Sequence, residues 1–415
     1  MNVLFVHQNF PAQYRHLALH FAAQPGNRVF FVTQPNDVEL PGVTKIAYPR
    51  PVREAVGCHY LAFDVDQAVR TGAAAAALCR TLRGEGVAPD IIIGHSGWGE
   101  TLFLKDVFPD VPLLAYFEFF YHSYGVDIDF DPEFTSVFAD PSRLRMRNAV
   151  NLVAYDAADW GHTPTRWQRG LYPPEMRGRI TAIHEGVDTD AVCPDPSAWI
   201  QMARANLRLT REDEVITYVA RNLEPYRGFH VFMRALPEIL RRRPKAHVVI
   251  VGGDGVSYGH PAPPGTTYRE MMFNEVSDRI DFERVHFLGQ IPYPAYLNLL
   301  RVSSVHVYLT YPFVLSWSFI ETLASGCLVI GSATPPVEEV LVHGENGLLV
   351  DFFSTREIAD RIDEVLDHPD RMQRVRDAAR ATAVTRFDLK RRQLPRWERL
   401  IGDLLEGRRP ALDVN

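Results

Sequence analysis

The chain contains a series of short apolar runs separated by amphipathic stretches, and this series occurs twice within 415 residues. Continuous apolar runs are typical of parallel strands that helices cover on both faces. The runs are Val3–His7, Val29–Thr33, Ile91–Gly94, Leu113–Phe117, Val215–Ala220, Val248–Gly252, His286–Leu288, Val305–Leu309 and Leu328–Ile330. The pattern predicts an α/β protein with two doubly wound, parallel-sheet domains.

A turn-rich segment from Ile183 to Pro196 separates the two series and predicts the connection between the domains. We therefore expect a first domain over residues 1–188 and a second over 189–387. The tail, residues 388–415, is rich in arginine and leucine and has a helical pattern as far as Gly407.

Composition excludes several classes of protein. A hydrophobic content of 46% with 23% charged residues indicates a globular chain, and a net charge of −7 gives no footprint for nucleic acid. The four cysteines form no CxxC pair, which favours a reducing compartment. Because the N-terminus resembles a buried strand and no apolar run approaches the length of a membrane span, we expect a cytoplasmic protein, either free or attached peripherally to the inner face of a membrane.

Two arginines follow a predicted strand of the second half, Arg221 directly and Arg227 six positions later. Guanidinium groups near a helix N-terminus suit a diphosphate. The alternatives are a surface salt bridge between Arg221 and Glu224, and a solvated loop charge for Arg227.

A second motif, from Phe313 to Gly326, predicts a helix with one carboxylate, Glu321. If Ser316 is the N-cap, the amides of Ser316 to Ser318 point toward a ligand phosphate and Glu321 can accept a ribose hydroxyl hydrogen. Alternatively, Glu321 closes a capping box that begins at Ser318.

These motifs form an ordered set with Ile250–Gly255, Val285–Gly289, Ala324–Ile330 and Glu338–Leu349. The set resembles the retaining glycosyltransferases of family 4 (glycosyl transferases group 1), whose GT-B fold has two Rossmann-like domains with a cleft between them. The resemblance implies a nucleotide-sugar donor, catalytic roles for Arg221 and Arg227, and main-chain donor contacts at Ser316, Trp317 and Ile291. It also implies that the C-terminal helix packs back on the first domain.

One position departs from the family pattern. The family has two glutamates separated by seven residues, and here the later is Glu321 while the earlier is replaced by Phe313. A phenyl ring cannot accept hydrogen bonds from sugar hydroxyls, so we expect a deoxygenated or acetamido-substituted donor sugar, or else a weakened enzyme. Gly253, in the run Gly252–Gly255, faces the nucleotide or simply ends a strand.

Candidates in the first half follow its predicted strands. Gln13 and Arg15 lie at a predicted helix start after the first strand, where Gln13 could touch the donor and Arg15 the acceptor; plain helix surface is the alternative. His95 and Trp98 follow a later strand and favour an acceptor site, with a structural histidine as the alternative.

The aromatic run Tyr116–Tyr124 supplies further candidates. Many family members have a histidine where this chain has Glu118, so Glu118 could act on the acceptor hydroxyl, with His122 as a second candidate and Tyr121 nearby. Lid or core packing is the alternative. The following acidic run, Asp127–Glu133, has Pro132 where a calcium loop needs glycine, so we expect an acidic surface loop and no metal site.

The sequence thus predicts a metal-independent, retaining glycosyltransferase of the hexosyltransferase type. It would need no cofactor beyond a nucleoside-diphosphate sugar as co-substrate, and its acceptor would be a carbohydrate, a lipid-linked group or a protein, as in bacterial-type glycan, polysaccharide or glycoconjugate synthesis. The alternatives are a sugar-nucleotide epimerase of the same fold and a catalytically weak nucleotide-sugar-binding protein.

Overall fold

A computed structural model describes residues 1–52, 57–134, 140–202 and 206–413. The chain forms two compact units. The first contains residues 1–123, 138–186 and 389–415, and the second contains residues 124–137 and 187–388. The second unit therefore includes a short segment from within the first half of the sequence, which the expected 1–188 boundary did not separate.

The first unit is built on a seven-stranded sheet in which every strand pair is parallel. Its order is β3 (Val43–Ala47), β2 (Arg28–Thr33), β1 (Asn2–Val6), β4 (Ile91–His95), β5 (Leu113–Tyr116), β6 (Trp160–Thr163) and β7 (Ile180–Ala182). The chain adds β2 and β3 on one side of β1 and then β4 to β7 on the other side. This change of direction is typical of the doubly wound fold.

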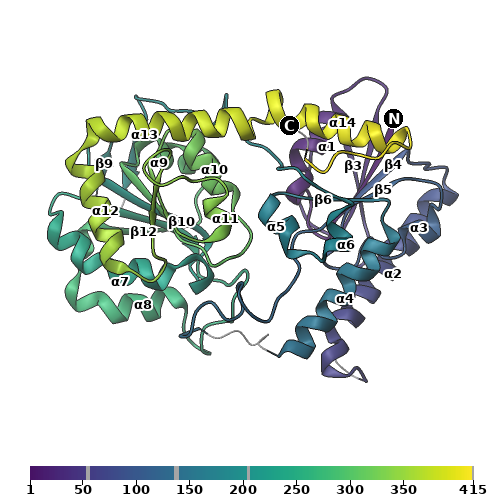
Figure 1. Cartoon of the computed structure of the whole chain (residues 1–415), viewed down its shortest axis with the longest axis horizontal. Helices are drawn as coiled ribbons and strands as arrows, with labels where there is room; N and C mark the ends of the chain where they lie inside the picture. The colour runs from purple at the N-terminus through teal and green to yellow at the C-terminus, as the bar shows by residue number, and fades with distance from the viewer. Residues whose placement is uncertain (53–56, 135–139, 203–205, 414–415) are drawn as a thin grey trace. The chain divides into compact units, whose positions relative to one another are not determined.

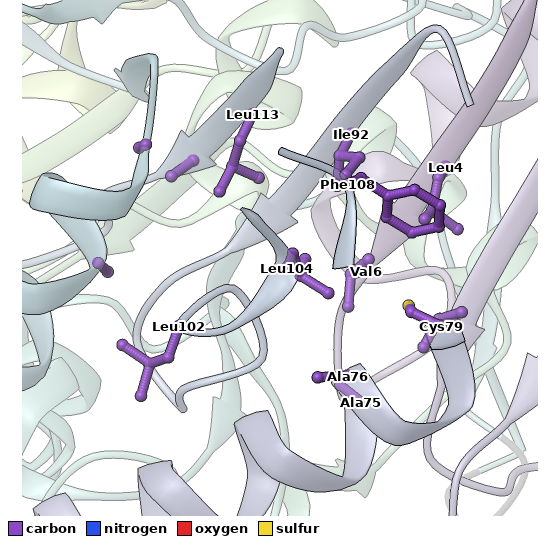
Figure 2. Packing of buried hydrophobic residues seen from close by; sticks show 14 of the residues in the cluster. Leu4, Val6, Ala75, Ala76, Cys79, Ile92, Leu102, Leu104, Phe108 and Leu113 are labelled. Atoms are coloured by element: carbon purple, nitrogen blue, oxygen red, sulfur yellow. The ribbon is translucent and has the colours of Figure 1, made fainter. Parts of the chain in front are cut away.

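Helices cover both faces of this sheet (Figure 1). One face packs against α2 (Phe63–Gly84) and α4 (Pro141–Ala157), and the other against α1 (Arg15–Ala22) and α14 (Leu394–Leu405). Figure 2 shows Leu4, Val6 and Ile92 of the sheet beside Ala76 and Cys79 of α2. The shorter helices are α3 (Leu104–Val107), α5 (Arg166–Leu171) and α6 (Pro174–Arg177).

The C-terminal helix α14 belongs to the first unit, as its apolar face requires. Trp397 of α14 is buried in the same core cluster as Phe5 and Phe31, and its indole nitrogen donates to the backbone oxygen of His184 at 3.3 Å. The helix begins after two short π-helical segments, Ala383–Phe387 and Leu389–Gln393, the first of which follows α13 (Pro369–Thr382).

The second unit is built on a six-stranded sheet, again parallel throughout. Its order is β12 (Val285–Gly289), β11 (His247–Gly253), β10 (Val215–Asn222), β13 (Val305–Tyr308), β14 (Val329–Ser332) and β15 (Leu348–Val350). A separate antiparallel hairpin joins β8 (Ile200–Met202) to β9 (Leu207–Leu209).

Helices flank this sheet as well (Figure 1). Helices α7 (Phe229–Arg242), α8 (Tyr268–Val276) and α12 (Thr355–Asp367) form one group, with α7 in contact with both others. Helices α9 (Tyr293–Val302), α10 (Trp317–Ala324), α11 (Pro335–Glu338) and α13 share one core cluster. The two parallel α/β units are the fold that the alternating apolar pattern predicts.

Candidate functional site

The second sheet has a topological switch point between β10 and β13, because the chain continues to β11 on one side and to β14 on the other. Open α/β sheets bind ligands beyond the carboxyl ends of their strands at such a point. Arg221 and Arg227 lie at or just after the end of β10, and Phe313 and Ser316 follow β13. The fold thus brings two of the sequence motifs to one edge of the sheet.

Arg227 is held in a fixed position at this edge. It ends a short 3₁₀ turn, Pro225–Arg227, and is only 7% exposed. Its Nη1 donates to Thr310 Oγ1 at 2.8 Å, to the backbone oxygen of Val314 at 3.0 Å and to Tyr308 Oη at 3.3 Å. A solvated loop charge is therefore the wrong interpretation of Arg227.

Gly228 explains how the chain makes this turn. Its φ of +66° lies in the left-handed region, and a Cβ there would stand 2.4 Å from Leu309 Cβ. Only glycine allows the segment after β10 to approach the segment after β13 so closely.

Arg221 is exposed at the end of β10. The proposed salt bridge with Glu224 is wrong, because Glu224 is buried and its carboxylate accepts hydrogen bonds from the backbone amides of Ser257, Tyr258 and Gly259 at 3.0, 3.1 and 3.0 Å. This carboxylate organises the loop after β11 and leaves the Arg221 charge at the surface.

An aromatic wall lies beside the Arg227 guanidinium. The ring of Tyr258 is 5.1 Å from Arg227 Cζ, within the range of a cation–π contact. Phe313 is 8% exposed, with its ring centroid 4.9 Å from that of Tyr258 and 5.4 Å from that of Tyr226. Phe313 thus places a packed phenyl ring where the family pattern has a carboxylate.

The start of α10 differs from one expectation. Ser316 is the N-cap and Trp317 the first helical residue, as the Ser316 alternative predicted. The Ser316 amide, however, donates to Tyr308 Oη at 3.0 Å, so the prediction of a free amide at this residue is wrong. Tyr308 is also the hydroxyl that Arg227 contacts, and it links the arginine to the helix start.

Glu321 does not close a capping box, so that alternative is wrong. Its two carboxylate oxygens accept hydrogen bonds from Tyr293 Oη at 2.7 Å and Tyr296 Oη at 2.8 Å, both on α9. Burial raises the pKa of Glu321, although both tyrosine bonds oppose the shift. The structure therefore gives this carboxylate two hydroxyl partners, which is the kind of partner that a ribose would offer.

Two other donor-side candidates have packing explanations. A Cβ at Gly253 would stand 2.7 Å from Asn222 Oδ1, the end of a side chain, so the glycine lies in a closely packed place at the end of β11. Ile291 packs against two core clusters and lines a hollow of about 1530 Å³ beside β12. Arg227 and Phe313 are not among the residues that line this hollow.

The first sheet also has a switch point, between β1 and β4. His7 follows β1 and His95 ends β4, and both are buried. The His95 ring stacks on Trp98 with centroids 4.1 Å apart, and the His7 ring lies 4.9 Å from His95 and 5.2 Å from Trp98. Burial, followed by the neighbouring His95, lowers the pKa of His7 well below its usual value, so His7 is neutral at pH 7.

Glu118 belongs to the same cluster. His95 Nδ1 accepts a hydrogen bond from the Gly97 amide at 3.0 Å, so the ring hydrogen of neutral His95 is on Nε2. That Nε2 lies 3.6 Å from Glu118 Oε2 and has no hydrogen-bond partner among the described residues. Gln13 Nε2 donates to Glu118 Oε1 at 3.4 Å. Four sequence candidates, Gln13, His95, Trp98 and Glu118, thus lie together.

Sequence reasoning missed a further layer of polar residues. Tyr14 Oη lies 3.4 Å from His162 Nε2, and Tyr116 Oη donates to Glu185 at 3.2 Å. Burial lowers the pKa of His162 and raises the pKa values of Tyr14 and Tyr116. The available signal was position, because His7, which was also missed, is the last residue of the first apolar run and directly follows β1.

The remaining candidates have other surroundings. His122 Nε2 contacts the backbone oxygen of Leu171 at 2.8 Å, and since a carbonyl only accepts, this nitrogen holds a hydrogen and is not a base. The Tyr121 ring stacks under Arg147, with Cζ 4.1 Å from its centroid. Arg15 is exposed at the first position of α1.

Comparison with known families decides what this arrangement belongs to. Residues 25–192 match the model of the glycosyl transferase family 4 group, and residues 201–382 match that of the glycosyl transferases group 1. The chain belongs to the group 1 glycosyltransferases. The GT-B fold expected from the sequence agrees with its structural neighbours, such as sucrose-phosphate synthase from Thermosynechococcus elongatus, which has a TM-score of 0.72 and 18% identity over 98% of this chain and 100% of that one.

Two curated relatives match parts of this glycosyltransferase in sequence. D-inositol 3-phosphate glycosyltransferase of Corynebacterium aurimucosum is 27% identical over 48% of this chain and 46% of its own length. GDP-mannose-dependent alpha-(1-6)-phosphatidylinositol monomannoside mannosyltransferase of Mycolicibacterium smegmatis is 28% identical over 64% of this chain and 66% of its own. The chain thus spans about half the length of the first of these relatives.

Every helix among the described residues of this glycosyltransferase is too short or too polar to cross a bilayer. In the same part of the chain, His, Cys, Asp and Glu side chains form no group of three or more that could hold a metal ion.

Proposed function

We propose that this protein is a retaining glycosyltransferase that moves a sugar from a nucleoside diphosphate to an acceptor hydroxyl. The observation that supports this most is Arg227 at the switch point of the second sheet, where it is buried and donates three hydrogen bonds. Arg221 is exposed at the end of the same strand. A preorganised cation stabilises charge that develops on a departing phosphate at little cost in reorganisation.

In this reaction the bond between the sugar C1 and the phosphate oxygen breaks, and a bond from C1 to the acceptor oxygen forms on the same face. The acceptor proton passes to the released diphosphate. Arg227 and Arg221 bind the diphosphate. Glu321 accepts hydrogen bonds from the ribose hydroxyls. Phe313 and Tyr258 contact the donor sugar. An apolar wall favours a deoxygenated or acetamido-substituted sugar, because it cannot satisfy hydroxyl groups.

On the first unit, Glu118 and His95 orient the acceptor. His95 Nε2 is buried and has no hydrogen-bond partner among the described residues, so its hydrogen is available for an acceptor oxygen. The relatives whose names include inositol phosphate and phosphatidylinositol mannoside support a polyol or glycolipid acceptor, including one presented at a membrane face.

A mass-spectrometric screen tests this function. The protein is incubated with UDP-, GDP- and dTDP-sugars, first alone and then with polyol, glycolipid and protein acceptors. Transfer predicts nucleoside diphosphate release that depends on an acceptor. A new sugar nucleotide without acceptor would indicate an epimerase. Nucleotide binding without turnover across the panel would indicate the weak-binding alternative that Phe313 suggests.

A further inference from the structure

Residues 124–134, which we call the arm, belong to the second unit although they lie between elements of the first. The sequence predicted an acidic surface loop here. That prediction is wrong for two of its carboxylates, because Asp127 is 2% and Asp131 is 3% exposed. Burial of a carboxylate is costly unless it is hydrogen-bonded, so the partners of these two residues explain the arm.

Both buried carboxylates accept hydrogen bonds from tyrosines of the second unit. Asp127 Oδ2 accepts from Tyr226 Oη at 2.9 Å, and Asp131 Oδ2 accepts from Tyr311 Oη at 2.6 Å. Asp131 also lies 3.1 Å from His230 Nε2. Burial opposes ionisation of Asp131, but the bonds from His230 and Tyr311 outweigh it and lower its pKa.

Other contacts of the arm fix it independently of these bonds. The Phe130 ring lies 5.1 Å from Tyr311, 5.0 Å from Phe352 and 5.3 Å from Phe353, measured between centroids. Glu133 forms a bidentate pair with Arg234 at 2.6 and 2.7 Å. The arm is therefore anchored at several points, and removal of one carboxylate need not release it.

The two tyrosines lie in the segments that surround the switch point. Tyr226 directly precedes Arg227 in the 3₁₀ turn, and its ring contacts Phe313. Tyr311 lies between Thr310 and Phe313 in sequence, and its amide donates to the backbone oxygen of Tyr226 at 3.0 Å. The Tyr226 and Tyr311 rings are 4.6 Å apart. The arm thus holds both segments that supply Arg227 and the aromatic wall.

We propose that Asp127 and Asp131 are positioning residues for donor binding, acting through Tyr226 and Tyr311 on the two segments that hold Arg227 and Phe313. The choice of donor as ligand rests on the proposed glycosyltransferase function. The mechanical part of the proposal, that the arm orders these segments, does not depend on it.

Hydrogen exchange of the full-length protein tests the mechanical part. Asp127→Ala and Asp131→Ala should each speed amide exchange in residues 224–229 and 309–316, because each removes the acceptor of a buried tyrosine hydroxyl. Asp129→Ala is the matched control, since Asp129 is exposed and its carboxylate accepts from Gly125 within the arm. Exchange in these segments that is unchanged from wild type would overturn the proposal.

Titration with UDP and GDP, together with donor kinetics, tests the functional part. Loss of one hydrogen bond to a charged acceptor is expected to raise the donor KM about tenfold, with a much smaller change in kcat. Asp127→Asn keeps an oxygen that can accept from Tyr226 and should restore most of the affinity. Tyr226→Phe should raise the donor KM as much as Asp127→Ala does. The double variant should bind the donor no more weakly than either single variant.

The outcomes separate the two proposals. If the wild-type protein binds neither UDP nor GDP and releases neither from its sugars, the proposed function fails, while the exchange result still decides the role of the arm. If wild type is active but Asp127→Ala has a donor KM like that of Asp129→Ala, or if Asp127→Asn is as impaired as Asp127→Ala, the positioning role is refuted.

Discussion

Replacement of Arg227 by alanine tests the central element of the proposed donor site. The guanidinium donates three hydrogen bonds in a buried setting, but two of its acceptors are hydroxyls that can rotate to new partners. The backbone oxygen of Val314 cannot rotate to a new partner. The free energy of unfolding should therefore fall by about the contribution of one hydrogen bond from a charged donor, about 2 to 3 kcal/mol. Loss of the charge at the phosphate should raise the barrier to transfer by about 2 to 4 kcal/mol, or about 30- to 1000-fold in rate.

The two effects are separable with Arg221→Ala as the comparison. Arg221 is exposed, so its removal should change the free energy of unfolding by less than about 0.5 kcal/mol and still slow transfer. Urea unfolding measures the first quantity, and nucleoside diphosphate release under single-turnover conditions measures the second. Unchanged turnover in Arg227→Ala would remove this residue from the mechanism, and unchanged stability would contradict the anchoring described for it.

Three further predictions concern buried groups. Burial raises the pKa of Glu100 from 4.5 to about 7, so between these pH values the native state keeps a proton that the unfolded chain has lost. The free energy of unfolding should therefore fall as pH rises from about 4.5 to 7. Glu100→Gln should flatten that fall in unfolding midpoints measured from pH 4 to 8. Glu321→Gln, which keeps the size of the side chain, should weaken UDP or GDP binding several-fold in calorimetry if this carboxylate binds ribose, and equal affinity would exclude that role. Phe313→Ala should destabilise the protein by about 3 kcal/mol in urea unfolding, because it removes a ring packed between Tyr226 and Tyr258, and a loss below about 1 kcal/mol would contradict that packing.

The architecture was accessible from the sequence because its signals are local. Every apolar run that predicted a strand is part of one, within a residue or two at either end. The strands that were missed are β3, β6, β7, β15 and the two hairpin strands β8 and β9, and the sequences of β6 and β3 explain why these two were missed. β6 contains Gly161 and His162, and β3 contains Lys45, so neither is a continuous apolar run.

The site was accessible only in part. Residues at strand ends could be chosen because the carboxyl edge of a parallel sheet is a known place for ligands. The partners of those residues could not, because they come from distant parts of the chain. Nothing local to Glu321 predicts the tyrosines of α9, and nothing in the run Asp127–Glu133 predicts that its carboxylates meet Tyr226 and Tyr311.

The arm also limits how far the second unit can be exchanged as a single contiguous piece of sequence. Its core is encoded by residues 187–388, yet two of its buried acceptors are encoded more than fifty positions upstream. A chimera that transplanted only the contiguous stretch into a relative would bury the hydroxyls of Tyr226 and Tyr311 without their carboxylates. Recombination between members of this family would then succeed more readily when the arm and residues 187–388 come from the same parent.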